Sequence, residues 1–265
     1  MEVPVLPLIT FIACRMFEDE IVHIVEKDDS IRSLLVIDNA DSGGLVTKLT
    51  DACCDYKLVA ETSLPDCQSD EGLTLVVEML ELALHAKPEH LKDVVYSKVR
   101  EMAAHSDGIL LFYGLCGNVL GKVDTELADL SCPVRILKED NGDVIDDCIG
   151  AVLGGRAAYL EKLKSFRGVG TFFMTPMWAA HWREMVVSAG MTPDADNIKL
   201  SKFVFDYAGY KNVAKMDTGL YYEKQFEAKV EEFAGLFDFD IIDMKANPDL
   251  LVRCYGKLKD EIFSE

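Results

Sequence analysis

Short apolar runs alternate with longer amphipathic segments along this chain, and this alternation most limits the folds open to it. The run LITFIAC (8–14) precedes a segment with helical spacing of apolar residues, and GILLFYG (108–114) follows another such segment at 88–105. Strands separated by helices are typical of βαβ units and a mostly parallel sheet. We therefore predict an α/β fold with a Rossmann-like sheet and helices on both faces.

The same pattern locates the other elements. Further strands are expected at 34–38, 56–61, 132–138, 169–175, 212–217 and 239–245. Helices are expected at 15–28, 72–86, 88–105, from 156 onward, and at 176–190, 221–237 and 247–258. The sequence fits a single α/β domain over 1–265, or two α/β lobes at 1–167 and 168–265, and the pattern does not choose between them.

Charge limits the class of partner. The 265 residues carry a formal net charge of −19. Such a surface repels the phosphates of nucleic acids and anionic lipids, so neither is expected as a partner. The acidity either serves solubility alone or favours a basic protein partner.

The first residues, MEVPVLPLITFIACRMF, are apolar but lack a basic start and are too short to span a bilayer. With no export signal and no membrane segment, we expect a cytoplasmic location. The eight cysteines are then reduced, which makes them candidates for metal binding, redox chemistry or burial.

The stretch FYGLCGN (112–118) places Cys116 between glycines where an apolar strand ends. Ligands of open α/β sheets bind beyond the carboxyl ends of the strands. Gly114 and Gly117 would let the backbone turn tightly there, and with Asn118 they are candidates to approach a cofactor. A phosphate-binding loop is excluded, because Cys116 replaces its first glycine and Val123 its Ser or Thr.

Cys14, Cys116 and Cys148 each follow a strand, or the loop after one, and precede a helical segment. They are therefore expected to meet at one sheet edge, with thiol pKa values lowered by helix N-termini. Three thiolates suit zinc with an open fourth position. An iron–sulfur cluster is the weaker alternative, since it normally requires four cysteines. Ordinary burial of unrelated thiols is the other alternative, and it is what we expect of the cysteines at 53, 54, 67, 132 and 254.

Aromatic and imidazole groups complete the candidate site. Trp178, His181 and Trp182 have the spacing of one helix face. They either pack in the core or form an aromatic wall with an imidazole that faces a cofactor. Tyr113 and His181 are the candidates for hydrogen-bonding or acid–base roles.

Several of these motifs together resemble a known family. FYGLCGN, the DCI element at 147–149, GTFFMTPMWAAHW and DTGLYY are similar to motifs of the archaeal and bacterial family called domain of unknown function 1638. The resemblance implies that Cys14, Cys116 and Cys148 are recurrent motif elements. It also implies an association with corrinoid-dependent methyl transfer, as in methanogenesis.

Two functions follow from the residues and the resemblance taken together. The first is a zinc-type protein in anaerobic one-carbon metabolism that acts on a thiol or a methyl-corrinoid. The second is a non-catalytic accessory protein that binds a corrinoid protein or a methyltransferase and handles metal or a cofactor. A fold with unrelated cysteines is the third possibility.

Overall fold

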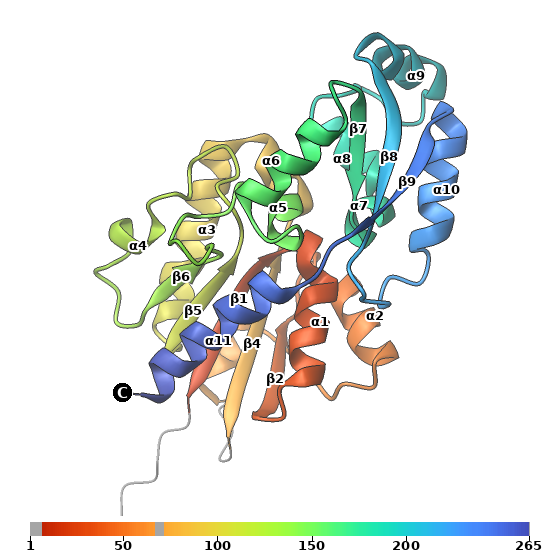
Figure 1. The fold of residues 1–265 in the computed structure, drawn as a ribbon. Helices are drawn as coiled ribbons and strands as arrows, with labels where there is room; N and C mark the ends of the chain where they lie inside the picture. The colour runs from red at the N-terminus through yellow and green to blue at the C-terminus, as the bar shows by residue number, and fades with distance from the viewer. Residues whose placement is uncertain (1–6, 67–71, 265) are drawn as a thin grey trace, which may run out of the picture.

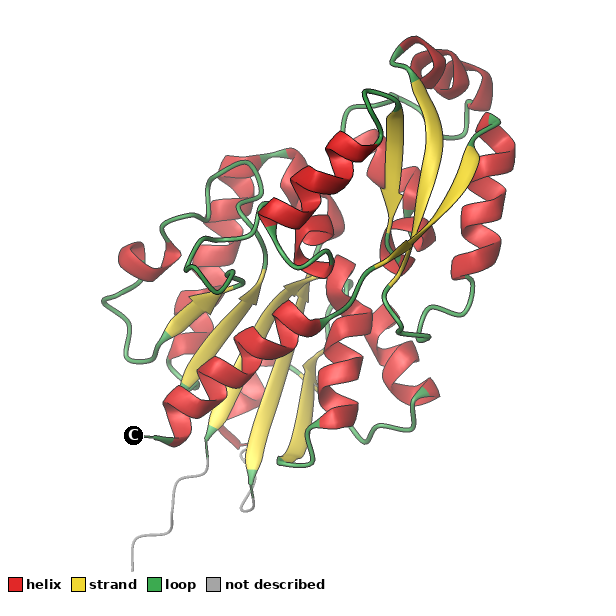
Figure 2. Cartoon of the chain, in the orientation of Figure 1, coloured by secondary structure: helices red, strands yellow, loops and turns green. Residues whose placement is uncertain are grey.

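The computed structural model describes residues 7–66 and 72–264, and within them it confirms the predicted α/β class (Figures 1 and 2). Six parallel strands of the described chain form the larger sheet, in the order β3-β2-β4-β1-β5-β6. Their bounds are β1 Leu8–Cys14, β2 Ile31–Ile37, β3 Lys57–Val59, β4 Leu73–Leu80, β5 Gly108–Phe112 and β6 Val134–Ile136.

A smaller parallel sheet, in the order β7-β8-β9, follows in the chain. Its strands are β7 Gly170–Met174, β8 Tyr210–Asp217 and β9 Asp240–Lys245. After β9 the chain returns to the larger sheet, where the closing helix α11 (Asp249–Phe263) lies across one face (Figure 1). The chain therefore connects the two sheets twice, first between β6 and β7 and again between β9 and α11.

The remaining helices in the described residues surround these sheets. They are α1 Glu18–Lys27, α2 Gly43–Asp51, α3 Pro88–Ala103, α4 Val123–Glu126, α5 Cys148–Val152, α6 Arg156–Ser165, α7 Pro176–Ala180, α8 Trp182–Ser188, α9 Ile198–Tyr207 and α10 Phe226–Phe237. Three short 3-10 helices are η1 Arg15–Phe17, η2 Glu61–Asp66 and η3 Leu82–Ala86.

Each face of the larger sheet has its own core. Leu8 and Ile12 of β1 pack with the apolar stripe of α3, while Ile9 and Phe11 pack with α1, α2 and α11. The second of these cores continues into the smaller sheet, where Phe172 of β7 is part of the same cluster. One continuous core therefore joins the two sheets on that side.

The predicted helix at 72–86 is wrong. Residues Leu73–Leu80 form β4, a central strand whose eight residues are all buried, and a 3-10 helix follows it. The misreading arises because LTLVVEML contains good helix formers and a charged Glu78. Glu78 is accommodated inside the fold because Lys98 of α3 lies 3.3 Å from its carboxylate.

Two further predictions differ from the structure. The helix expected at 176–190 is divided at His181 into α7 and α8, because His181 leaves the helical conformation with φ −113° and ψ 22°. Helix α9 did not appear in the sequence pattern. Cys67, expected in a polar loop, lies outside the described residues.

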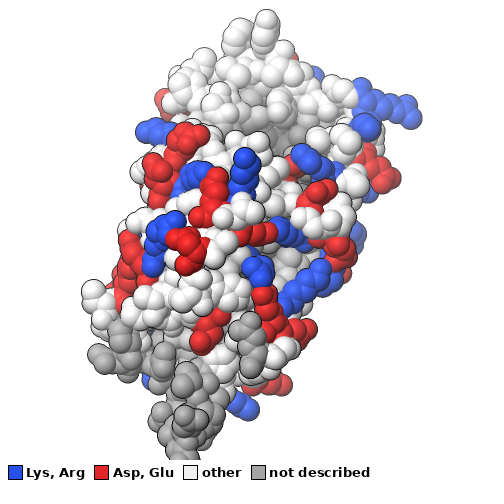
Figure 3. Space-filling view, turned by 90° about the vertical axis from the view of Figure 1, so that its left-hand side faces the viewer, with Lys and Arg blue, Asp and Glu red and all other residues white. Residues whose placement is uncertain are grey.

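The acidic surface is not segregated on the face drawn in Figure 3, where acidic and basic groups are interspersed. On this face the acidic groups therefore do not form one continuous patch, despite the formal net charge of −19.

Candidate functional site

A cavity of about 330 Å³ lies beyond the carboxyl ends of β1, β4 and β5, and its lining includes Cys14, Cys116 and Cys148. Cys14 is the last residue of β1, and Cys148 is the first residue of α5. Helix α1 follows β1 on one face of the sheet while α3 follows β4 on the other. In open α/β sheets, ligands bind where two neighbouring strands are followed by helices on opposite faces of the sheet. We call this space the thiol cavity.

The loop that carries Cys116 is held by close backbone contacts. Cys116, Gly117 and Asn118 all have positive φ, at 44°, 80° and 67°. Leu115 N donates to the carbonyl of Ile145 at 2.8 Å. A β-carbon on Gly114 would lie 2.8 Å from that same carbonyl oxygen, so this glycine permits the approach.

This geometry corrects one expectation about the loop. Gly114 and Gly117 do not carry Cys116 into the start of a following helix, because the residues after it form turns as far as α4. Instead Gly114 lets the loop approach the segment that leads to Cys148, and Gly117 lets it approach Pro88 of α3. Gly114 therefore helps to bring two distant thiol-bearing segments together.

Burial dominates the electrostatics of the three thiols. Desolvation raises the pKa of Cys14 to about 12 and that of Cys116 to about 11. Desolvation and then the neighbouring Asp147 raise the pKa of Cys148 well above its ordinary value, and Cys14 and Cys116 add to the increase. The expected lowering by helix N-termini is therefore wrong, because loss of water outweighs any helix dipole at these positions.

Tyr113 lies in the lining of the thiol cavity and is only 3% exposed. Among the described residues its hydroxyl has no hydrogen-bond partner. Buried hydroxyls are rarely left unpaired, since the lost hydrogen bond with water costs free energy. The hydroxyl oxygen is itself buried, so a ligand in the cavity reaches it only if the Tyr113 side chain moves.

The other sequence candidates divide into two groups. Gly114, Gly117 and Trp178 line the thiol cavity. Asn118 and Trp182 do not: Asn118 is exposed on the turn, and Trp182 packs edge-on against Phe237, with ring centroids 5.8 Å apart. Of the predicted aromatic wall, the structure therefore places Trp178 alone in the cavity lining.

His181 is also outside the cavity lining. Its Nε2 lies 3.4 Å from Nη2 of Arg15, which must be the donor because a guanidinium cannot accept. Burial, followed by the charges of Arg15 and Lys48, lowers the pKa of His181 to about 4. The ring is therefore a neutral acceptor for Arg15.

Sequence reasoning missed another imidazole. His85 lines the thiol cavity, and its Nδ1 donates to the carbonyl of Leu82 at 2.8 Å. It was overlooked because residues 72–86 were predicted as one helix. Recognition of β4 would have placed His85 just beyond a strand end, where the other cavity residues were found.

The three thiols line one cavity, but their side chains are not arranged to bind a metal ion. Within residues 7–66 and 72–264, no three His, Cys, Asp or Glu side chains converge closely enough to hold a metal ion. Donor type and location fit a thiophilic metal. The side chains would have to turn toward one another to bind it.

Residues 79–255 match the family described as "Protein of unknown function (DUF1638)". The chain belongs to this family. The matched DUF1638 region contains Cys116 and Cys148, whereas Cys14 precedes it. No curated protein and no solved structure matches the chain.

No helix in the described part of this DUF1638 protein is long and apolar enough to cross a membrane.

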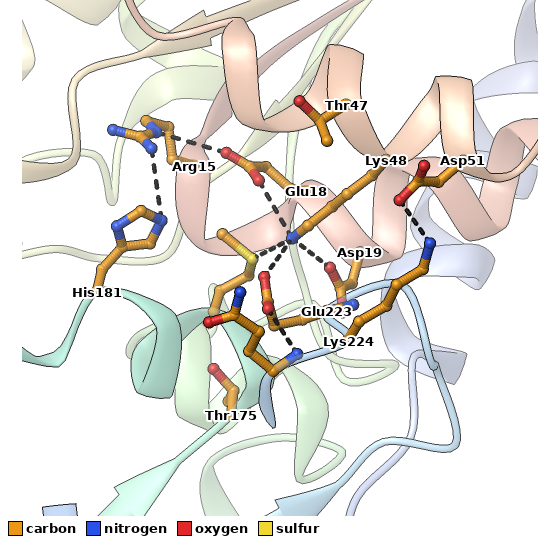
Figure 4. Close-up of polar contacts among 12 residues, drawn as sticks. Arg15, Glu18, Asp19, Thr47, Lys48, Asp51, Thr175, His181, Glu223 and Lys224 are labelled. Carbon is orange, nitrogen blue, oxygen red and sulfur yellow. Dashed lines mark hydrogen bonds and ion pairs between the residues drawn. The ribbon is translucent and has the colours of Figure 1, made fainter. Parts of the chain in front are cut away.

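A second polar cluster of this DUF1638 protein lies beside the segment that follows Cys14 (Figure 4). Lys48 of α2, only 7% exposed, donates to Asp19 at 2.6 Å and lies 3.2 Å from Glu18 and 3.7 Å from Glu223. Its ammonium group also contacts the sulfur of Met177 in α7. The cluster therefore joins α1 and α2 to elements around the smaller sheet.

The charges of this cluster depend on one another. Burial alone would lower the pKa of Lys48, but Asp19 and Glu18 raise it above its ordinary value, so the side chain is charged. Burial raises the pKa of Asp19 while Lys48 opposes that rise. Removal of Lys48 would leave Asp19 without a cation and Glu18 with Arg15 alone, at 3.4 Å.

Proposed function

We propose that the chain binds a thiophilic metal ion, zinc by default, through Cys14, Cys116 and Cys148 in the thiol cavity. The observation that carries the proposal is that three cysteines distant in sequence line one cavity at a sheet edge. Asp146, Asp147 and Glu81 also line it. Their acidity favours a cation. A bound cation would also stabilise the thiolate form of the cysteines, which burial otherwise keeps protonated.

Zinc bound by three thiolates would supply a Lewis-acidic position that a substrate thiol or methyl donor can reach. Around it, the residues of the chain have distinct roles. Cys14, Cys116 and Cys148 would each release a proton on binding. Trp178 would exclude water, and the hydroxyl of Tyr113 would hydrogen-bond to the ligand once the side chain turns toward the cavity. His181 has no part in this proposal, because Arg15 occupies its acceptor nitrogen.

The size of the cavity limits the substrate. About 330 Å³ is at the lower end of small-molecule sites. It suits a thiol or a methyl group rather than a corrin ring. We therefore propose that the methyl group passes from the cobalt of a methyl-corrinoid, free or presented by a partner corrinoid protein or methyltransferase, to the sulfur of a thiolate. The Co–C bond breaks, a thioether forms, and the electron pair stays on the corrinoid as cobalt(I). An iron–sulfur cluster is disfavoured, since among the described residues no fourth cysteine lines the cavity.

Metal content tests the binding proposal. Protein purified without oxygen and reconstituted with zinc should hold about one ion per chain, and Cys14→Ser, Cys116→Ser and Cys148→Ser should each lose most of it. Cys132→Ser is the matched control, because Cys132 is buried in the α3 core rather than the thiol cavity. Retention of zinc by all three cavity variants would overturn the proposal.

Activity tests the reaction. Zinc-loaded protein mixed with methylcobalamin and a thiol should change the cobalamin spectrum, and the Cys116→Ser variant should not. If metal binds and no spectral change appears, the accessory function is favoured. Capture of a corrinoid protein by the wild-type chain would then support that alternative.

A further inference from the structure

Two aspartates precede Cys148 in the lining of the thiol cavity, and both are held by contacts within the chain. Asp146 pairs with Arg156, whose Nε donates to Oδ2 at 3.0 Å and whose Nη2 lies 2.9 Å from Oδ1. Asp147 accepts a hydrogen bond at Oδ1 from the backbone N–H of Gly150, at 2.8 Å. Each carboxylate therefore already has a partner on the segment that contains Cys148.

Asp147 is the N-cap of α5, the helix that begins at Cys148. Its backbone is extended, with φ −158° and ψ −174°, and its side chain pairs one of the N–H groups that the first helical turn leaves free. Helix α5 has only five residues, and one of them is Gly150. A helix this short is marginal by itself, and a glycine weakens it further, so the cap matters more here than in a longer helix.

The other end of α5 is held independently of the cap. The carbonyl of Val152 accepts from the backbone N–H of Asn247 at 2.9 Å, and Gly155 N donates to the carbonyl of Gly150 at 2.8 Å. Ile149 and Val152 are also buried in the core. Loss of the cap would therefore free the first turn, while the rest of the helix stays in place.

The residues before the cap contact the loop that carries the second thiol. The backbone N–H of Cys116 donates to the carbonyl of Asp146 at 3.4 Å. Asp147 is the next residue, and its side chain then holds the helix that starts at Cys148. The cap is therefore the last link between the Cys116 loop and the position of Cys148.

We infer that Asp147 is a positioning residue of the thiol cavity: its carboxylate holds the first turn of α5, and with it Cys148, in place for a metal ion rather than binding the ion itself. The inference rests on the proposed function for the presence of the ion. The position of Cys148 does not depend on metal, so metal-free protein tests it as well. Removal of a side chain that orients a metal ligand typically weakens metal binding about tenfold or more.

Two neutral substitutions separate the hydrogen bond of Asp147 from its charge. Asp147→Asn keeps an oxygen that can accept from Gly150 N–H, and Asp147→Ala does not. Zinc affinity, measured by competition with a chromophoric chelator, should be about tenfold lower in the Ala variant than in the Asn variant. In metal-free protein, iodoacetamide should alkylate Cys148 about threefold to tenfold faster in the Ala variant, because the first turn opens more often.

Asn197→Ala is the matched control. Asn197 caps α9 in the same way, since its Oδ1 accepts from Leu200 N at 3.1 Å, and it is not among the residues that line the thiol cavity. This variant should lose a comparable amount of stability in urea but keep the wild-type zinc affinity and Cys148 alkylation rate. If Asp147→Ala does not fold, Asp147→Gly takes its place, because N-caps accept glycine although it has no side-chain acceptor.

The outcomes separate this inference from the proposed function. If the wild type binds no zinc, the metal proposal fails, and the alkylation rates of Cys148 alone then decide whether Asp147 positions it. Equal rates in the Asn and Ala variants would refute the inference, whether or not zinc binds. Where zinc binds, equal affinities of the two variants would also refute it, because the charge of Asp147 or direct ligation, and not its hydrogen bond, would then control the site.

Discussion

Gly117 lies so close to Pro88 that a β-carbon on the glycine would be 2.7 Å from Cγ of the proline ring. Pro88 is the first residue of α3, and Gly117 follows Cys116 in the loop beyond β5. The contact fixes the thiol-bearing loop against the start of α3. The glycine is required both by this approach and by its φ of 80°.

Gly117→Ala should therefore lower stability by more than its backbone strain alone. The positive φ costs about 1 kcal/mol for alanine, and the clash with a rigid ring adds about 1–3 kcal/mol. Gly142→Ala is the matched control, because Gly142 has φ 90° but nothing within 4 Å of its β-carbon position. Urea denaturation should give a clearly larger loss for Gly117→Ala, and equal losses would refute the importance of the contact.

Lys48→Met should strongly destabilise the fold. The change leaves Glu18 and Asp19, each with a side chain only 1% exposed, without their shared cation. Breaking a buried ion pair in this way costs about 3–5 kcal/mol. The measurement is the free energy of unfolding in urea at neutral pH.

Lys224→Met provides the comparison for that variant. Lys224 donates to Asp51 at 2.6 Å, but its side chain is 67% exposed (Figure 4). An exposed pair contributes at most about 1 kcal/mol. Similar losses for the two variants would show that the buried cluster is not held by Lys48.

The sequence predicted the elements whose periodicity is unambiguous. GILLF, continuously apolar, is β5 with every residue buried, and the rule that ligands bind beyond strand ends located three thiols that share a cavity. LTLVVEML failed because a short apolar run with Leu and Glu suits a helix as well as a strand. Only the pairing of β4 with β1 and β2 resolves that ambiguity.

The wrong predictions about site residues have a similar physical cause. His85 could not be found while β4 was predicted as a helix. His181 and Trp182 were placed with Trp178 by regular helical spacing, but the chain leaves the helix at His181. The thiol pKa values were misjudged because a sequence shows proximity to a helix start but not the extent of burial.

Glu20 should make stability depend on pH. It is 3% exposed, and burial followed by the charge of Asp19 raises its pKa from 4.5 to about 8. Between those values the folded state binds a proton that the unfolded state has lost, so stability falls as pH rises through this window. Each unit of the raised pKa corresponds to about 1.4 kcal/mol.

Glu20→Gln should remove that dependence. The variant should gain stability relative to the wild type from pH 5 to pH 8, and the difference should level off above pH 8. Glu231→Gln, at an exposed position of α10, is the control. If the wild type and Glu20→Gln keep a constant difference across this range, the carboxyl group does not titrate as inferred.

The cavity thiols should react slowly with iodoacetamide in metal-free protein. At pH 8 a thiol whose pKa is about 11, as for Cys116, is ionised in about one molecule in a thousand, and only the thiolate attacks. The exposed Cys53 should therefore be alkylated about a hundredfold faster or more. Mass spectrometry of peptides resolves the sites. The rate at Cys116 should rise about tenfold for each pH unit from 7 to 10, and a plateau near pH 8 would show that burial does not control this thiol.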